Sequence, residues 1–254
     1  MDWKGRKVLV TGGAGFVGSH VVDGLVAGGH EVLVLDDLST GSAEFIHESA
    51  TLVQMDVADP ELAGVVERFA PEAVSHLAAQ ASIPASMADP VTDARVNIVG
   101  GLNVFDAAVS ADASQLIYVT TGGALYGEPD YLPCDEDHPI RPASAYGMSK
   151  WTLERYLAML APGRLALKVL RLANIYGPRQ DPHGEAGVVS IFALKMLRNQ
   201  TVTVFGDGEQ TRDFVYVGDV VAAHELAMNA PPSTTVNVSS GIELSVNELL
   251  GKLA

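Results

Sequence analysis

The sequence has little that would cross-link the chain or anchor it in a membrane. Among its 254 residues there is one cysteine, Cys134, so no disulfide forms within the chain. No uninterrupted apolar run approaches the roughly 18 residues that a membrane-spanning helix needs. The first residues also lack the apolar core and cleavage site of a signal peptide. These absences predict a cytoplasmic protein without membrane contacts.

Positive charge is scarce as well. The 31 Asp and Glu residues outnumber the 16 Lys and Arg residues, giving a formal net charge of −15, and the basic residues form no cluster. Nucleic acids and anionic membranes bind clustered cations, so neither is an expected partner. The seven histidines include no pair at i, i+4. We therefore expect no metal site.

What the sequence does contain is a steady alternation of short apolar runs and helical patterns. Continuously apolar runs are typical of parallel strands that are covered on both faces. The strands predicted in this way are 7–11, 31–37, 51–57, 73–78, 115–120 and 165–172. The helices predicted between them are 16–28, 60–69, 91–110 and 144–160. This repetition predicts an α/β fold with a doubly wound parallel sheet.

The pattern changes after about residue 173. A stretch rich in Gly, Pro and charge begins at residue 174 and predicts a long loop. A helix over 187–199, a strand over 201–205, an extended stretch over 212–217 and a helix over 218–229 are expected to follow. A last helix is expected to begin after Ser245, which is a good cap residue. The shorter elements indicate a small second lobe packed against the sheet.

The run VTGGAGFVG (10–18) lies between the first predicted strand and the helix that begins at Phe16. Two glycine spacings fit a phosphate-binding turn, one starting at Gly12 and one at Gly13, and both include Gly15 and Gly18. A helix N-terminus offers a pyrophosphate free N–H groups and the positive end of the helix dipole. The position of the glycines therefore predicts a dinucleotide site.

An acid at the end of the next strand supports this interpretation. Asp36 follows the run EVLVL, where a carboxylate accepts hydrogen bonds from the adenosine ribose hydroxyls. Between Lys7 and Arg68 the sequence contains no lysine or arginine. A 2′-phosphate would find no local cation, so NAD is expected rather than NADP.

A candidate acid/base pair lies farther along the chain, in the run SAYGMSK. Tyr146 and Lys150 are four residues apart, so on a helix they share a face. A lysine ammonium near a phenol favours the phenolate, and we expect it to lower the pKa of Tyr146 toward neutrality.

Several motifs in this order resemble the extended short-chain dehydrogenase/reductases. Within them the resemblance is to the NAD-dependent epimerase/dehydratase family, most of all its UDP-glucose 4-epimerases. The motifs span nearly the whole chain: TGGAGFVGSH (11–20), MDV (55–57), HLAAQAS (76–82), TTGGALYGE (120–128), YGMSK (146–150), RLANIYGPRQ (171–180) and GDGEQTRDFVYVGDV (206–220).

The resemblance implies an NAD-binding Rossmann domain over residues 1–173 and a substrate-binding lobe over 174–254, partly interleaved and incomplete at its C-terminal end. It implies that Tyr146, Lys150 and Thr121 are catalytic and that Thr121, Asn174 and Arg212 bind a UDP-sugar. The cofactor residues that it implies are Gly12, Gly15, Phe16, Val17, Gly18, Asp36, Asp37, Asp56, Val57, Leu77, Ala78, Ala79, Tyr146 and Lys150.

The activity that the resemblance implies is reversible NAD-dependent epimerisation at C4 of a UDP-hexose. A transient 4-keto sugar would turn and accept the hydride on its other face. The resemblance also implies a homodimer formed by the helices 91–110 and 144–160. Both helices have more apolar residues than one core-facing stripe needs, such as Val104, Phe105 and Leu157.

One position departs from the family pattern. The usual catalytic Ser or Thr position holds Gly122, and the nearest hydroxyl belongs to Thr121. Thr121 is the candidate, while water or Tyr126 is the alternative. A 4,6-dehydratase is disfavoured because Gly122 and Gly123 replace the expected acids. A UDP-glucuronate 4-epimerase, a UDP-glucuronate decarboxylase and a non-catalytic NAD-binding protein stay open.

Overall fold

A computed structural model describes residues 5–182 and 187–254 of the chain. Residues 1–4, which belong to the segment predicted to lack a signal peptide, lie outside the described residues. So do residues 183–186, which include His183 and part of the predicted loop after residue 173.

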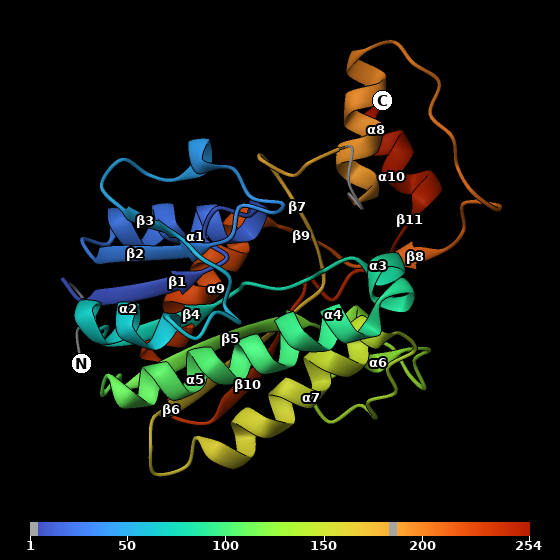
Figure 1. The fold of residues 1–254 in the computed structure, drawn as a ribbon. Coiled ribbons are helices and arrows are strands. Elements are labelled where there is room, and N and C mark those ends of the chain that lie inside the picture. The colour runs from blue at the N-terminus through green and yellow to red at the C-terminus, as the bar shows by residue number, and fades with distance from the viewer. Residues whose placement is uncertain (1–4, 183–186) are drawn as a thin grey trace.

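The core of the molecule is one seven-stranded sheet in the order β10-β6-β5-β4-β1-β2-β3 (Figure 1). Every neighbouring pair in it is parallel. Six of its strands confirm the predicted ones, some with shorter ends. The strands are β1 (Lys7–Thr11), β2 (Glu31–Asp36), β3 (Thr51–Gln54), β4 (Ala73–His76), β5 (Gln115–Thr121), β6 (Ala166–Leu172) and β10 (Thr234–Val238).

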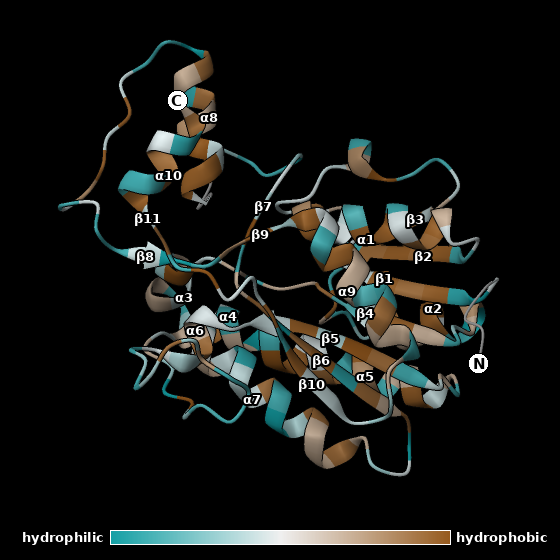
Figure 2. Cartoon of the chain, turned by 180° about the vertical axis from the view of Figure 1, so that it is seen from behind, coloured by the Kyte–Doolittle hydropathy of each residue, from teal (hydrophilic) through white to brown (hydrophobic). Residues whose placement is uncertain are grey.

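Helices cover both faces of this sheet, because alternate strand residues point to opposite sides. Leu9 faces the cluster formed with α2 (Leu62–Phe69), α5 (Gly101–Ser110) and α7 (Ala145–Leu160). Val8 and Val10 face α1 (Phe16–Ala27) and α9 (Val217–Asn229). Figure 2 shows the strands as a hydrophobic layer between the helices. The fold is therefore the expected doubly wound, Rossmann-type sheet.

The predicted helix 91–110 is present but is not uniform. It consists of α4 (Pro90–Ala94), a π-helical turn η2 (Arg95–Gly100) and α5. The predicted dimer contact cited three apolar residues as more than one core-facing stripe needs. All three are fully buried: Val104, Phe105 and Leu157. That part of the dimer argument was wrong, because these side chains fill the core under the helices.

A smaller region lies beside the carboxyl ends of the strands (Figure 1). Its helices are α8 (Val188–Leu197) and α10 (Val246–Leu253), and a capping box at Ser245 opens α10 as expected. Short strands form two pairs: β7 (Asn174–Tyr176) with β9 (Phe214–Tyr216), and β8 (Thr211–Arg212) with β11 (Leu244–Ser245).

One strand prediction in this region was wrong, and the predicted extended stretch 212–217 is present as two short strands, β8 and β9. Residues 201–205 form no strand, and Phe205 is 82% exposed, because no sheet edge pairs with this run. The run 212–217 is split at Asp213, whose carboxylate instead accepts hydrogen bonds from the N–H groups of Ser240 and Gly241. The predicted long loop begins with a strand, β7.

The sequence analysis also missed β10, which pairs with β6 at the edge of the main sheet. After residue 216 the chain therefore rejoins the large sheet: α9 packs on α1 and on one face of the sheet, and β10 adds a strand at its edge. The domain boundary at residue 173 stays a prediction. Within the described residues, no helix has the length and apolar character to span a membrane.

Candidate functional site

The predicted cofactor residues gather where β1 and β4 lie side by side at the centre of the sheet. In doubly wound folds this is the switch point, where ligands bind beyond the carboxyl ends of the strands. The glycine turn follows β1, and Leu77, Ala78 and Ala79 follow β4. The N–H of Leu77 donates to the carbonyl of Thr11 at 3.0 Å, and that of Ala78 to the Thr11 hydroxyl at 3.3 Å.

The glycine turn leaves no room for side chains at two positions. Gly12 has a φ of +72°, and a Cβ there would lie 2.5 Å from the Ala78 nitrogen. A Cβ on Gly18 would overlap the carbonyl of Gly12. At Gly15, which precedes α1, no side chain caps the start of this described helix. The first backbone N–H groups of any helix lack intrahelical acceptors. In α1, whose first turn begins with Phe16 and Val17, no capping side chain among the described residues accepts from them either.

Asp36 connects the end of β2 to the glycine turn. It is 7% exposed, and its carboxylate accepts hydrogen bonds from the Ala14 N–H and the Leu38 N–H, each at 2.9 Å. Its neighbour Asp37 is exposed and accepts hydrogen bonds from the backbone N–H and hydroxyl of Ser39. Asp36 is thus the carboxylate that is fixed beside the turn.

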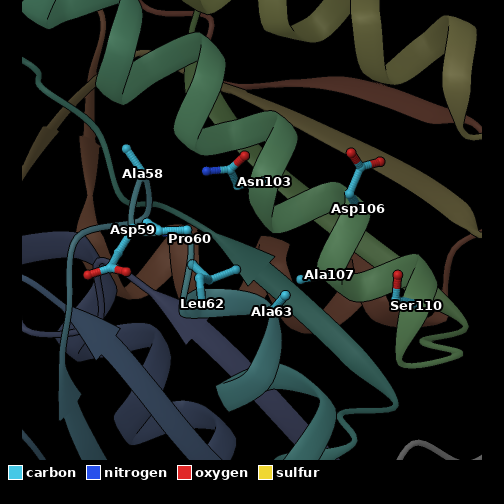
Figure 3. A pocket seen from close by; sticks show the side chains of 9 residues that line it. All are labelled: Ala58, Asp59, Pro60, Leu62, Ala63, Asn103, Asp106, Ala107 and Ser110. Atoms are coloured by element: carbon cyan, nitrogen blue, oxygen red, sulfur yellow. The ribbon is translucent and has the colours of Figure 1, made fainter.

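Asp56 and Val57 follow β3 at the same edge. Asp56 forms an ion pair with Arg95 at 2.9 Å, and the carbonyl of Val57 accepts a hydrogen bond from Asn103 at 3.3 Å. Arg95 is a cation that the sequence analysis did not place here. A surface pocket of about 250 Å³ lies beyond these residues, between the start of α2 and α5 (Figure 3). None of the predicted site residues lines it.

Tyr146 and Lys150 lie in the first turns of α7, which Ser144 caps. The N–H of Tyr146 donates to the Ser86 hydroxyl at 3.1 Å, which ties it to α3 (Ile83–Ala88). The Lys150 ammonium is buried. It donates to the carbonyl of Val119 on β5 at 3.0 Å.

The protonation of this pair differs from the expectation. Burial lowers the pKa of Lys150 to about 7, against the carboxylates of Asp93 and Glu154, which raise it. Burial, and then Asp93, raise the pKa of Tyr146 to about 12. The predicted lowering of the tyrosine pKa was therefore wrong for the free chain, because desolvation of the phenolate dominates.

Thr121 ends β5, on the strand that also carries Val119. Its hydroxyl accepts a hydrogen bond from the Ala124 N–H at 3.3 Å. The alternative hydroxyl, that of Tyr126, is buried and occupied: it donates to Asn237 at 2.7 Å and accepts from Arg171 at 3.1 Å. This geometry favours Thr121 over Tyr126 as a hydroxyl available to a ligand.

Asn174 and Arg212 meet in a different place, a pocket of about 400 Å³ in the smaller region. Asn174 starts β7 and Arg212 ends β8, and both side chains are exposed. Apolar residues such as Phe192 and Phe214 line the rest, together with Lys195, a second cation that the sequence analysis missed. The pocket combines an amide, two cations and apolar walls.

Three polar residues near the pair were also missed: Gln80, Asp93 and Asn97. Asp93 and Asn97 are buried, each 1% exposed, and both bond to Gln80 after β4. The sequence did offer one sign of them: Asp93 and Asn97 are polar residues on the buried face of the predicted helix 91–110, whose other buried side chains are mainly apolar. Within the described residues, no group of three or more His, Cys, Asp or Glu side chains is arranged to hold a metal ion.

Comparisons with known proteins agree with this geometry. The UDP-glucose 4-epimerase of Mycolicibacterium smegmatis is 45% identical over 250 residues, covering 96% of this chain and 80% of that protein. A crystal structure of the Thermotoga maritima UDP-glucose 4-epimerase with UDP-glucose matches with a TM-score of 0.93 and 44% identity, over 97% of this chain and 81% of that one.

The Thermus thermophilus UDP-glucose 4-epimerase, solved in complex with NAD, matches with a TM-score of 0.90 and 44% identity, over 98% of this chain and 82% of that one. Residues 8–239 match the family model of the NAD dependent epimerase/dehydratase family. The chain belongs to this family.

Proposed function

We propose that this chain interconverts UDP-glucose and UDP-galactose by NAD-dependent epimerisation at C4. The observation that carries the proposal is the placement of Tyr146 and Lys150 against the end of β5, at the edge of the sheet that holds the glycine turn. The relatives named above are UDP-glucose 4-epimerases, and structures of such enzymes contain UDP-glucose or NAD.

The residues at the switch point fit NAD. Gly12 and Gly18 keep backbone in a space that a Cβ would fill, which lets a pyrophosphate approach the start of α1. Asp36 is positioned for the ribose hydroxyls, and Asp56, Val57, Leu77, Ala78 and Ala79 line the strand ends beside it. The chemistry that bound NAD supplies is the reversible uptake of a hydride from sugar C4.

The chain's own residues handle the proton and the oxygen. Tyr146 takes the proton of the 4-hydroxyl and later returns it, while Thr121 hydrogen-bonds the same oxygen. Lys150 holds a positive charge close to Tyr146 and would bind the nicotinamide ribose of NAD. Because Tyr146 is a phenol in the free chain, this step needs additional positive charge to reach the site before the phenolate forms.

The pocket of the smaller region is the proposed seat of the UDP group. Arg212 and Lys195 supply charge for the diphosphate, Asn174 supplies an amide, and the aromatic walls suit a uracil ring. Placing the nucleotide there leaves the sugar free to present either face of C4 to the sheet edge.

A homodimer through α4, α5 and α7 is part of the proposal. Helices α4 and α7 and the π-helical turn that leads into α5 carry apolar side chains that stay exposed: Val91 78%, Val99 49%, Met148 51%, Tyr156 41% and Met159 67%. Such a set suits an interface between copies of the chain. The cytoplasmic location inferred from the sequence stays a prediction.

The test is product analysis by NMR after incubation with UDP-galactose. We expect UDP-glucose to form without net reduction of NAD and without solvent deuterium at C4, because the same hydride leaves and returns. A 4-keto-6-deoxy product would assign the chain to the dehydratases. Bound NAD with no turnover of UDP-galactose or UDP-galacturonate would support a non-catalytic role.

A further inference from the structure

A buried carboxylate lies close to the start of α7. Asp93, in the first turn of α4, is 1% exposed, and its Oδ1 accepts hydrogen bonds from Gln80 Nε2 at 3.0 Å and Asn97 Nδ2 at 2.9 Å. Among the ion pairs of the described residues, none involves Asp93. A carboxylate removed from water and held by neutral amides is costly. Its presence here suggests a purpose beyond packing.

The amides that hold Asp93 also connect two parts of the site. Asn97 accepts from the Gln80 N–H and donates to the Gln80 carbonyl, both at 2.9 Å, which fixes the segment after β4. Asn97 also donates to the Ser149 hydroxyl at 3.2 Å, and this hydroxyl donates to the Tyr146 carbonyl at 2.9 Å. Asn97 lies in the π-helical turn, and such turns are frequent at functional sites.

The other charged neighbours of Lys150 are already compensated. On α7 itself, Glu154 forms a buried ion pair with Arg171 of β6 at 2.6 Å. On β4, burial and the charge of Lys150 lower the pKa of His76 to about 3, so this imidazole is neutral. Asp93 differs from Glu154 in forming none of the ion pairs found among the described residues, and Asn97 links it to Ser149, the neighbour of Lys150 on α7.

Two tyrosines complete the surroundings of the ammonium. The ring of Tyr118 on β5 lies 4.6 Å from Lys150 Nζ, and burial raises the pKa of its hydroxyl well above the ordinary value. Tyr146 is likewise a phenol in the free chain. Neither contributes negative charge, so carboxylates alone oppose the discharge of Lys150 by burial, and Asp93 is the larger influence.

We propose that Asp93 is a positioning residue for Tyr146 and Lys150: its carboxylate, linked through Asn97 to Ser149 beside Lys150, favours the ammonium form of Lys150, and its amide partners hold α7 against the segment after β4. The catalytic meaning of this arrangement rests on the proposed function. The coupling of the two charges is a property of the free protein and is measurable without turnover.

The experiment is a pH titration of the chain labelled with ¹³C at lysine Cε, followed by NMR. The Lys150 signal is assigned by its loss in Lys150→Met. In Asp93→Asn, which removes the charge and keeps the shape, we expect the pKa of Lys150 to fall by about 1 or more, the scale for a nearby opposite charge. Asp93→Glu retains the charge and should restore most of the wild-type value.

Two controls make the result specific. Lys168 is also buried, but only burial lowers its pKa, so its signal should titrate unchanged in every Asp93 variant and report that the fold is intact. Asp106→Asn removes an exposed carboxylate from α5 and should leave Lys150 unchanged. Should Asp93→Asn not fold, Asp93→Ser removes the charge and leaves space for water between the amides.

A folded neutral variant in which Lys150 titrates as in the wild type would overturn the proposal. With an active enzyme, the alkaline limb of the pH profile of kcat/KM, which reports the free enzyme, should move to lower pH in Asp93→Asn by the amount seen in the titration. Asp93→Glu should move it back, which a purely structural role would not do. Failure of UDP-galactose to turn over would count against the proposed function and leave the titration decisive for Asp93.

Discussion

The large sheet and the smaller region are built by different means. In the sheet, the inner strands are buried, mainly apolar runs that pair in parallel with their neighbours and are covered on both faces. In the smaller region, the strands have two or three residues each and pair across long stretches of sequence, as β8 does with β11. The strands that carry the proposed cofactor site are thus buried on both sides, while residues of the proposed sugar-nucleotide pocket such as Asn174 and Arg212 are exposed.

This difference separates the consequences of mutation. Changes at the sheet edge are expected to alter proton transfer, folding or NAD binding, since these residues are fixed by buried contacts. Changes in the smaller region are expected to alter UDP-sugar binding alone. A variant that violates this division would show that the two regions are coupled more tightly than their contacts suggest.

The largest effect is expected at the sheet edge, from Tyr146→Phe. Removing the hydroxyl removes the proposed proton carrier, so kcat should fall ~10²–10⁴-fold. NAD binding should persist, because the Tyr146 backbone keeps its bond to Ser86. Turnover of UDP-galactose measures this. Tyr131→Phe, which removes an exposed phenol hydroxyl outside the site and outside the proposed interface, is the matched control and should be active.

The next effect concerns stability. Arg171 and Glu154 form an ion pair with side chains only 6% and 7% exposed, and Arg171 also donates to the Tyr126 hydroxyl. Arg171→Met leaves the carboxylate buried without its partner, which should cost about 3–5 kcal/mol of unfolding free energy. Urea denaturation measures it.

Arg141→Met is the control for that measurement. Its ion pair with Asp130 is exposed, so the loss should be below about 1 kcal/mol. Equal losses in the two variants would show that burial of the Arg171 pair is not what makes it important.

The same contrast explains what the sequence could predict. Six strands were predicted from apolar runs such as KVLVT, because strands buried on both faces are apolar throughout. Four helical segments were predicted from the amphipathic or alanine-rich stretches between these runs. The run TVTVF at 201–205 has the same local character but meets no sheet edge. The strand β10 has a weak pattern of its own and forms because β6 offers an unpaired edge. Long-range pairing leaves little local signal.

The candidate site follows the same rule. Gly12, Asp36, Tyr146 and Lys150 belong to local motifs and were named from the sequence. Asp93 and Asn97 act through contacts with Gln80, which lies 13 or more residues away, and no short motif announces them. The pKa of Tyr146 was predicted in the wrong direction, because a spacing of four residues carries no information about desolvation.

A moderate effect is expected from Asp36→Ala. It removes the carboxylate proposed for the ribose and also the acceptor of the Ala14 and Leu38 N–H groups. NAD affinity should weaken by ~1–3 kcal/mol, the scale for hydrogen bonds to a charged group. The preference for NAD over NADP should shrink, which competition titrations measure. Asp37→Ala, next to it but exposed, should change both little.

The smallest expected effect lies in the other region, at Arg212. Its side chain is exposed, lines the 400 Å³ pocket and donates to the carbonyl of Thr211 at 2.7 Å, so nothing in the core depends on it. Arg212→Ala should raise KM for UDP-galactose about tenfold, because one cation for the diphosphate is lost while Lys195 stays. The change in kcat, NAD affinity and unfolding free energy should be small. Arg198→Ala removes an exposed arginine just after α8, outside the pocket residues, and serves as the control for net charge. If Arg212→Ala weakened NAD binding as strongly as UDP-galactose binding, the assignment of cofactor and nucleotide sugar to separate regions would be wrong.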